Sequence, residues 1–358
     1  MRGLLRALDT LRLTLAGPSE PDAGHYRMLG QLSADIDAAL VPLQPSGGRC
    51  ALLDFPAHSN VGDSAIWLGE SVWLRRHRAR VVYACDVETY SPGTLAARLG
   101  GGTILLHGGG NLGDLWEQHQ RFRETVIRDF PDNPIVQLPQ TIHFRDAERI
   151  VAAQRAFNAH RDLTLLCRDE PSLAFARAHF MGRSMLCPDM AFALGRLRRP
   201  GKAAVDIVWL ARTDIESADA SAPATSADIE RGDWLAERGT PLYHRHRALN
   251  AQLAAGGVAH DAVVDRLIRT CDRLARERVL RGCRMLSRGR VVITDRLHGH
   301  ILCLLLGIPH VVLDNNYGKV RGFHEQWTRS SHLTRWAASP AEALDAARAM
   351  ARTPVRGR

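Results

Sequence analysis

The residues best suited to chemistry lie in Val291–His300, where an arginine and two histidines follow a strand-like run. The first four residues predict a buried strand, and Ile301–Leu306 predicts an apolar helix. Ligands of open α/β sheets bind at the carboxyl ends of the strands. Arg296 and His298 stand at such a corner and suit a phosphate or a carboxylate. The alternative is an arginine paired with a core carboxylate beside a buried histidine, and both interpretations stay open here.

A second stretch with chemical potential is the glycine triplet Gly108–Gly110, which follows the predicted strand Thr103–His107. Successive glycines let backbone amides approach a ligand closely, although a plain turn is the alternative. The stretch lacks the Lys-Ser/Thr of a nucleotide-hydrolase phosphate loop and is not G-x-G-x-x-G, which disfavours nucleotide hydrolysis and ordinary dinucleotide binding. The residues expected to contact the ligand are His107, Gly109, Gly110 and Asn111.

Polar residues also follow the other predicted strands, so that His, Arg and Asp occupy successive strand ends. Each has a structural alternative, such as a helix cap, a surface histidine, or a local pair between Arg168 and Asp169. Lys319 is one of only two lysines in the chain, which hints at a point-charge role, but a solvated lysine is the alternative. The candidates are Asp63, His143, Arg168, Asp189, Asn315, Asn316 and Lys319.

Short apolar strands alternate with helices along the chain, which predicts an α/β fold with mostly parallel sheets covered on both faces. A composition change near residue 200 divides 358 residues into two α/β domains, which we expect to face a cleft. Residues 215–230 lack an apolar period and predict a surface loop. The expected segments are an N-terminal helical segment (1–45), a first domain (46–199), a second domain (200–335), and a last helix (336–358) that could cross back to the first domain.

The formal charge of +9 does not indicate nucleic-acid binding. Of 47 basic residues only Lys202 and Lys319 are lysines, and the arginines are scattered with no aromatic-interleaved stripe. A basic field still favours an anionic substrate. The seven cysteines form no C-x-x-C, so they predict reduced core residues of a cytoplasmic protein and no metal site. Leucines in residues 4–15 predict an amphipathic helix that packs on its own domain, with peripheral contact at the inner face of the membrane as the alternative.

Taken together, these motifs resemble the polysaccharide pyruvyl transferase family over roughly residues 50–330. The first 45 residues and the 215–230 stretch are not covered and inherit nothing from the resemblance. The matching pieces are Gly62–Ile66, Gly108–Asp114, Pro139–His143, Arg168–Ser172, Pro188–Phe192, Thr294–His300 and Asp314–Phe323.

The resemblance implies a GT-B-like pair of Rossmann-like domains. It also implies transfer of the enolpyruvyl unit of phosphoenolpyruvate to a sugar of a cell-surface polysaccharide or its lipid-linked precursor. The product would be a pyruvate ketal, with release of phosphate and without a cofactor or metal. His143, Arg168, Arg296, Leu297 and His298 would line the donor site. We expect both arginines to hold donor anions and the histidines to assist proton transfer or phosphate departure.

Two rival functions remain open from the sequence. A GT-B sugar-nucleotide-dependent glycosyltransferase could use the same cations on a diphosphate, since fold does not fix function. A catalytically inactive polysaccharide-binding subunit is the other. For pyruvyl transfer, we expect Asp63, Asn111 and Asp189 to orient the saccharide acceptor or a loop.

Overall fold

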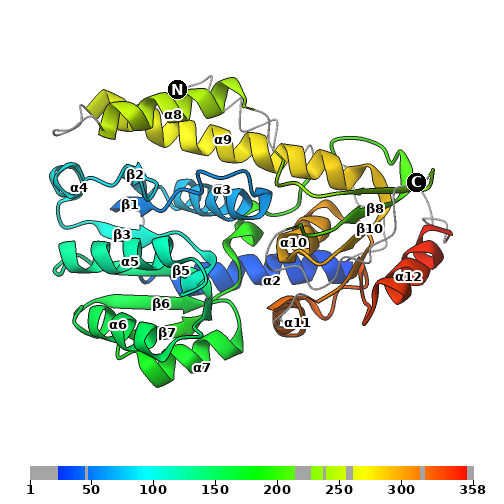
Figure 1. Ribbon diagram of the computed structural model, residues 1–358, viewed down its shortest axis with the longest axis horizontal. Coiled ribbons are helices and arrows are strands. Elements are labelled where there is room, and N and C mark those ends of the chain that lie inside the picture. Colours follow the sequence, from blue (N-terminus) through cyan, green and yellow to red (C-terminus); the bar gives the residue numbers. More distant parts are fainter. Residues whose placement is uncertain are drawn as a thin grey trace. The chain divides into compact units, whose positions relative to one another are not determined.

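The computed structural model describes residues 23–44, 47–213, 227–236, 239–254, 261–314 and 319–352 (Figure 1). The strands are β1 (Arg49–Leu53), β2 (Arg80–Cys85), β3 (Thr103–Leu106), β4 (Gly109–Gly113), β5 (Ile135–His143), β6 (Leu163–Cys167), β7 (Arg183–Leu186), β8 (Val205–Leu210), β9 (Ile229–Gly232), β10 (Gly289–Thr294), β11 (His310–Val312) and β12 (Thr334–Trp336). The helices are α2 (Ala23–Leu40), α3 (Val61–Arg76), α4 (Pro92–Leu99), α5 (Glu117–Asp129), α6 (Ala147–Asn158), α7 (Glu170–His179), α8 (Pro241–Ala254), α9 (Asp261–Ser287), α10 (Leu297–Leu306), α11 (Lys319–Phe323) and α12 (Pro340–Arg352). Short turns of other helix types cover Met190–Leu194 and His324–Thr328.

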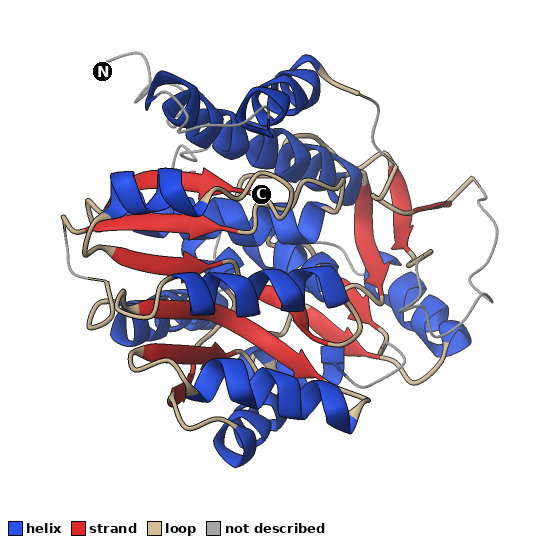
Figure 2. Ribbon diagram, turned by 60° about the vertical axis from the view of Figure 1, so that its left-hand side comes forward, coloured by secondary structure: helices blue, strands red, loops and turns tan. Residues whose placement is uncertain are grey.

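The chain divides into two compact units, each built on its own parallel sheet (Figure 2). The N-terminal unit comprises Ala34–Ala193 and Glu237–Arg278. The C-terminal unit comprises Met1–Ser33, Leu194–Ala236 and Val279–Arg358. The prediction of two Rossmann-like α/β domains is therefore confirmed.

The sheet of the N-terminal unit has the strand order β2-β1-β3-β5-β6-β7, with β4 pairing with β5. All these pairings are parallel. After β1 the chain runs outward to β2 and then returns to place β3 on the other side of β1. The gap between the ends of β1 and β3 is therefore the topological switch point, where ligands of such sheets bind.

Local sequence explains where the helices of this unit begin. Asn60 caps α3 by accepting from the Gly62 amide, and Asp169 caps α7 by accepting from the Ser172 amide. Apolar residues of the strands and helices then bury one core, which includes Leu53, Leu106 and Phe157.

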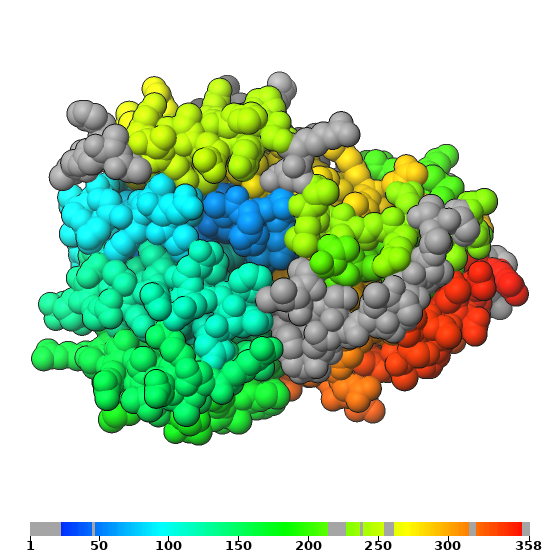
Figure 3. Space-filling model, viewed as in Figure 1, coloured from blue at the N-terminus to red at the C-terminus, as the bar shows by residue number. Residues whose placement is uncertain are grey.

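Residues 237–278 group with the N-terminal unit, although chain order suggested the second domain. Val264 of α9 lies in the core of this unit, and Asn250 of α8 donates to the buried Asp86 carboxylate after β2. In Figure 3 the yellow-green side chains of α8 border the cyan surface formed by residues near β2 and α4. Packing, not chain order, therefore assigns these two helices.

The sheet of the C-terminal unit has the parallel order β12-β11-β10-β8-β9. Its switch point lies between the ends of β8 and β10. Gly299 lets α10 pack closely there, because a Cβ would lie 2.5 Å from the Thr294 hydroxyl oxygen. Ala343 and Ala347 of α12 are buried in the core of this unit, so by packing the last helix belongs here and not to the first domain.

Several elements differ from the sequence expectations. The glycine stretch forms β4, where a loop was expected, and the expected 215–230 loop already ends in β9 at Ile229. Its residues up to 226 lie outside the described residues, as do the N-terminal leucines of residues 4–15.

Candidate functional site

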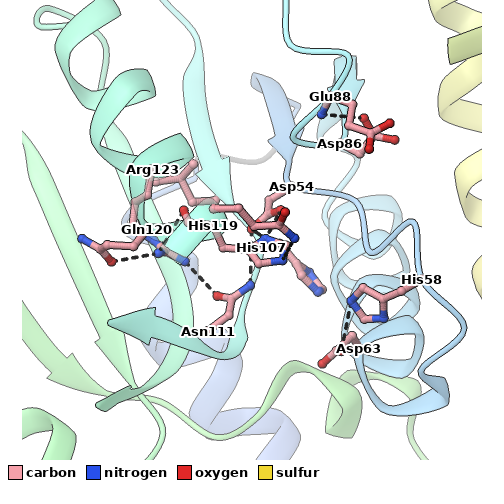
Figure 4. A network of polar contacts seen from close by, with 12 residues as sticks. Asp54, His58, Asp63, Asp86, Glu88, His107, Asn111, His119, Gln120 and Arg123 are labelled. Atoms are coloured by element: carbon pink, nitrogen blue, oxygen red, sulfur yellow. Dashed lines mark hydrogen bonds and ion pairs between the residues drawn. The ribbon is translucent and has the colours of Figure 1, made fainter. Parts of the chain in front are cut away.

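A network of buried polar side chains occupies the switch point of the N-terminal sheet (Figure 4). Asp54 follows β1 and His107 follows β3, so the two neighbouring strands deliver a carboxylate and an imidazole to the same edge. Asn111 on β4 and the α5 residues His119 and Arg123 complete the network. Buried polar groups of this density are costly unless they are paired, so their arrangement indicates function.

Asp54 holds His119 through its carboxylate. The distances from His119 Nδ1 to Asp54 Oδ1 and Oδ2 are 2.8 and 3.1 Å. Asp54 has φ +72°, a left-handed conformation that non-glycine residues seldom adopt and that clusters at functional sites. Burial raises the pKa of this carboxyl, but the hydrogen bond and charge of His119, with Arg123 and His107 nearby, outweigh burial and lower it. Asp54 is therefore a carboxylate, and Nδ1 of His119 carries the proton.

His107 is held by Glu70, a carboxylate buried in the apolar helix α3. His107 Nδ1 lies 2.8 Å from Glu70 Oε2, and the Gly108 amide donates to Oε1 at 2.9 Å. Burial lowers the pKa of His107, but the charge and hydrogen bond of Glu70 raise it above its ordinary value. Nε2 of His107 is buried and has no hydrogen-bond partner among the described residues.

Arg123 joins these groups to the central strand β5. Its guanidinium donates to Gln137 Oε1, to Asn111 Oδ1 at 2.9 Å and to Gln120 Oε1 at 3.2 Å. Burial lowers the pKa of Arg123 to about 10, so it stays charged at neutral pH. This cation balances Asp54 within the network.

Close backbone packing, which the sequence does not reveal, explains why the stretch at residues 108–113 contains glycines. A Cβ at Gly108 would lie 2.8 Å from the Pro139 carbonyl oxygen, and one at Gly113 would lie 1.8 Å from that of His143. Gly109 has φ +127° and lies beside the Asp63 carboxylate. The glycines thus let β4 approach β5. Contact of Gly109 and Gly110 with a ligand stays a prediction.

Asp63 lies in the first turn of α3 and His143 ends β5, and both lie outside the buried network. Asp63 accepts from the Asn60 amide nitrogen at 2.8 Å, and His58 Nε2 lies 3.5 Å away. His143 ends β5, is half-buried, and accepts from Arg145 Nε at 3.2 Å.

Arg168 and Asp189 form a fully buried ion pair with an Nη1–Oδ2 distance of 2.7 Å. The structure thus gives Arg168 a different partner from the neighbouring Asp169, which caps α7 instead. Arg168 Nε also donates to the Thr141 hydroxyl at 2.9 Å.

In the C-terminal unit, Arg296 stands at the N-cap of α10 and is also paired. Its Nε and Nη2 donate to the two oxygens of Asp233 at 2.7 and 2.6 Å, a bidentate pair in which both side chains are buried. Asp233 also accepts from the Thr213 hydroxyl at 2.8 Å and from the Trp234 amide at 2.7 Å. The pair thus connects the ends of β8, β9 and β10.

Leu297 and His298 begin α10 and are buried. Neighbouring Asp295 accepts from the Arg212 amide at 3.0 Å, and burial raises the pKa of its carboxyl. Asn315 and Asn316 lie outside the described residues, and of Lys319 only the backbone is described.

A chain of buried histidines in the same unit was not predicted. His310 Nδ1 donates to the Ile308 carbonyl at 2.8 Å, so its neutral Nε2 accepts from His300 Nδ1 at 2.7 Å. His300 Nε2 then accepts from the Thr328 hydroxyl at 2.8 Å, which in turn accepts from His324 Nδ1 at 2.9 Å. Burial lowers the pKa of His310 to about 4 and that of His300 well below its ordinary value. Neutral rings satisfy every contact of this chain.

Sequence analysis missed four members of the N-terminal network. Asp54 lies within the strand-like run Ala51–Phe55, and His119 and Arg123 lie within a stretch, about Trp116–Asp129, whose sequence predicts only a helix. Glu70 carried the clearest signal, because it is the only acid in the largely apolar stretch Ala65–Leu74 and must find a partner there. Asp233 could not be linked to Arg296 from sequence, since 63 residues separate them.

Comparisons with known proteins agree on one family. The family model for polysaccharide pyruvyl transferase matches residues 60–317. The chain is 32% identical to pyruvyl transferase 1 of Schizosaccharomyces pombe, over 80% of this chain and 71% of that protein. It is 30% identical to a Bacillus subtilis protein provisionally named pyruvyl transferase EpsO, over 83% of this chain and 91% of that protein.

A solved structure of a functionally uncharacterized Klebsiella pneumoniae protein has the same fold. Its TM-score is 0.54 at 18% identity, and the match covers 86% of this chain and 99% of that chain. No helix among the described residues has the length and apolar character needed to cross a membrane. The family match begins after β1 and ends before β12, so it includes all the other strands of the two sheets, and the chain belongs to the polysaccharide pyruvyl transferase family.

Proposed function

We propose that this transferase moves the enolpyruvyl unit of phosphoenolpyruvate to a sugar of a cell-surface polysaccharide or its lipid-linked precursor. The product is a pyruvate ketal across two hydroxyls, and phosphate is released. The observation that carries the proposal is the family match over residues 60–317, which includes the Arg296–His298 corner at the C-terminal switch point. A GT-B-like use of the two units is part of the same proposal.

The proposed donor contacts suit the two anionic groups of phosphoenolpyruvate. Arg296 brings a guanidinium to the start of α10, where backbone amides without helical partners also favour an anion. His298 is the second residue of α10 and can assist phosphate departure. We also keep Arg168 as a second cation for the donor anions, His143 as a catalytic candidate in contact with the donor, and Leu297 as a lining residue.

The acceptor contacts are proposed for the N-terminal network. Asn111 and Gly109 lie on β4 beside Asp63, at the edge where sheets of this type bind ligands. His107 and Gly110 belong to the same edge, and Asp189 supports it by fixing Arg168. Asn315, Asn316 and Lys319 stay candidates for further polar contacts.

The test is phosphate release from phosphoenolpyruvate with a panel of p-nitrophenyl hexosides, followed by mass analysis for pyruvyl addition. We expect release that depends on an acceptor. A parallel thermal-shift series compares phosphoenolpyruvate with nucleotide sugars. Stabilisation by nucleotide sugars alone, without pyruvyl addition, would contradict the proposal and favour a glycosyltransferase.

Arg296→Ala should lower phosphate release by about 10²-fold or more, because an anion contact made during the reaction is lost. Arg288→Ala is the matched control, since Arg288 forms an exposed pair with Glu230 in the same unit. Equal activity of the two variants would remove Arg296 from the donor site. Circular dichroism of both variants checks that each is folded.

A further inference from the structure

The Asp54–His119 pair has the geometry of an oriented catalytic imidazole. The carboxylate accepts from Nδ1 through both of its oxygens, so Nε2 of His119 keeps its lone pair. Such an arrangement fixes the tautomer and orientation of an imidazole that acts as a base.

Of the two side chains, that of His119 is the more accessible. The side chain of His119 is 11% exposed, whereas that of Asp54 is 3% exposed. The amide nitrogen of Gln118, an exposed residue, lies 3.3 Å from Nε2 and can donate to its lone pair. A ligand hydroxyl could take this place, because it also donates a hydrogen bond.

Backbone strain at Asp54 supports a role in chemistry. An aspartate with φ +72° at the end of a buried strand costs free energy, which the contacts of its carboxylate with His119 and Asn111 must offset. At the switch point, the strained conformation of Asp54 directs its carboxylate toward His119 of α5.

We infer that His119 is the general base that accepts the proton of the attacking acceptor hydroxyl, with Asp54 as its positioning residue. This inference rests on the proposed function. Asn111 strengthens the arrangement, because its amide nitrogen lies 3.4 Å from Asp54 Oδ2 while its oxygen accepts from Arg123.

The proton balance of the reaction is complete with this one base. Addition of the first hydroxyl forms its O–C2 bond, and the C2=C3 electron pair becomes a new C3–H bond. His119 Nε2 takes the hydroxyl proton and returns a proton to C3. Phosphate then leaves with the C2–O electron pair, the second hydroxyl bonds to C2, and its proton passes through Nε2 to the phosphate.

The charged and titratable groups around His119 come from every neighbouring element. They are Asp54 after β1, His58 before α3, Asp63 and Glu70 on α3, His107 after β3, and Arg123 on α5. Asp54 and Arg123 offset one another, as do Glu70 and His107. A base that must be unprotonated gives kcat/KM an acidic limb, which falls as pH falls.

The experiment compares pH profiles of phosphate release from phosphoenolpyruvate, using the full chain and the p-nitrophenyl hexoside with the highest turnover. His119→Gln should lower kcat by about 10²- to 10⁴-fold and remove the acidic limb, with little change in the KM for phosphoenolpyruvate. Asp54→Asn should lower kcat by about 10²-fold or more, because an amide no longer fixes the tautomer. Asparagine tolerates the left-handed backbone, so this second variant adds no backbone strain, and circular dichroism checks that both variants are folded.

His77→Gln is the matched control. His77 and Asp37 form another histidine–aspartate pair in the same unit, with a 3.0 Å contact outside the network. We expect an unchanged profile for this variant. Turnover by a folded His119→Gln or Asp54→Asn chain with the normal acidic limb overturns the base assignment alone. Absence of any phosphate release by the unaltered chain overturns the proposed function, and the assignment with it.

Discussion

Arg168 and Asp189 show how a candidate binding residue can also be essential to folding. Both side chains are buried, and removal of one partner leaves an uncompensated charge in the interior. An experiment on Arg168 therefore has to distinguish a loss of donor binding from a loss of folding stability.

We expect Asp189→Ala to lower the free energy of unfolding by about 3–5 kcal/mol, because it leaves the Arg168 charge unpaired. Urea denaturation followed by tryptophan fluorescence measures the change. Glu117→Ala is the control, since its pair with Arg121 is exposed and worth about 0–1 kcal/mol. A similar loss of unfolding free energy in the two variants would show that the buried pair stabilises the fold no more than the exposed pair.

At the scale of elements, β4 depends on two glycines that let it lie against β5. Gly113 has φ +134°, and a Cβ there would lie 1.8 Å from the His143 carbonyl oxygen, which is backbone and cannot move aside. Asn111, which contacts Asp54 and Arg123, lies on this strand. Displacing β4 would therefore disturb the polar network as well as the sheet.

Gly113→Ala should destabilise the protein by more than 1 kcal/mol, because it adds both a clash and backbone strain. Gly93→Ala is a matched control within α4, where a Cβ would meet nothing within 4 Å. That variant should be neutral or gain about 0.4–1 kcal/mol. Thermal unfolding of both variants decides the prediction, and an equal midpoint for Gly113→Ala would refute it.

The elements were more predictable than their contacts. Largely apolar runs such as Leu163–Cys167 and Val205–Leu210 identify parallel strands, and the structure confirms them. β4 escaped prediction because glycines have low strand propensity, and it pairs only because β5 extends for nine residues.

The candidate site was predictable only in part, for a physical reason. Residue types at strand ends follow from sequence, as for Arg296 and His107, but partners depend on tertiary packing. Asp233 and Glu70 are therefore visible only in the structure. A backbone conformation such as that of Asp54 leaves no sequence signal, because aspartate adopts it through tertiary constraint.

At the scale of the molecule, the histidine chain predicts acid sensitivity. His300 and His310 are neutral in the folded state, whereas the unfolded chain binds their protons near pH 6.5. The unfolded state thus binds more protons, and stability falls as pH falls from about 6.5 toward about 4. His107 does not oppose this trend in that window, because its raised pKa makes its stabilisation complete below about pH 6.5.

Urea unfolding midpoints measured at pH 7.5 and pH 5.0 test this expectation. We expect a lower midpoint at pH 5.0. His310→Gln should be less stable at pH 7.5 but show a smaller difference between the two pH values, because one titrating ring is gone. An unaltered pH difference in this variant would assign the acid sensitivity to other groups.

The seven cysteines are free and buried, as the sequence predicted for core residues. Burial raises the pKa of each thiol, for example to about 12 for Cys50 and Cys283, so the folded protein should resist alkylation. Cys283 and Cys303 belong to the C-terminal unit, and the remaining five belong to the N-terminal unit. The thiols are consequently native reporters of local opening. Timed alkylation and peptide mass mapping would reveal which unit unfolds first without a single engineered label.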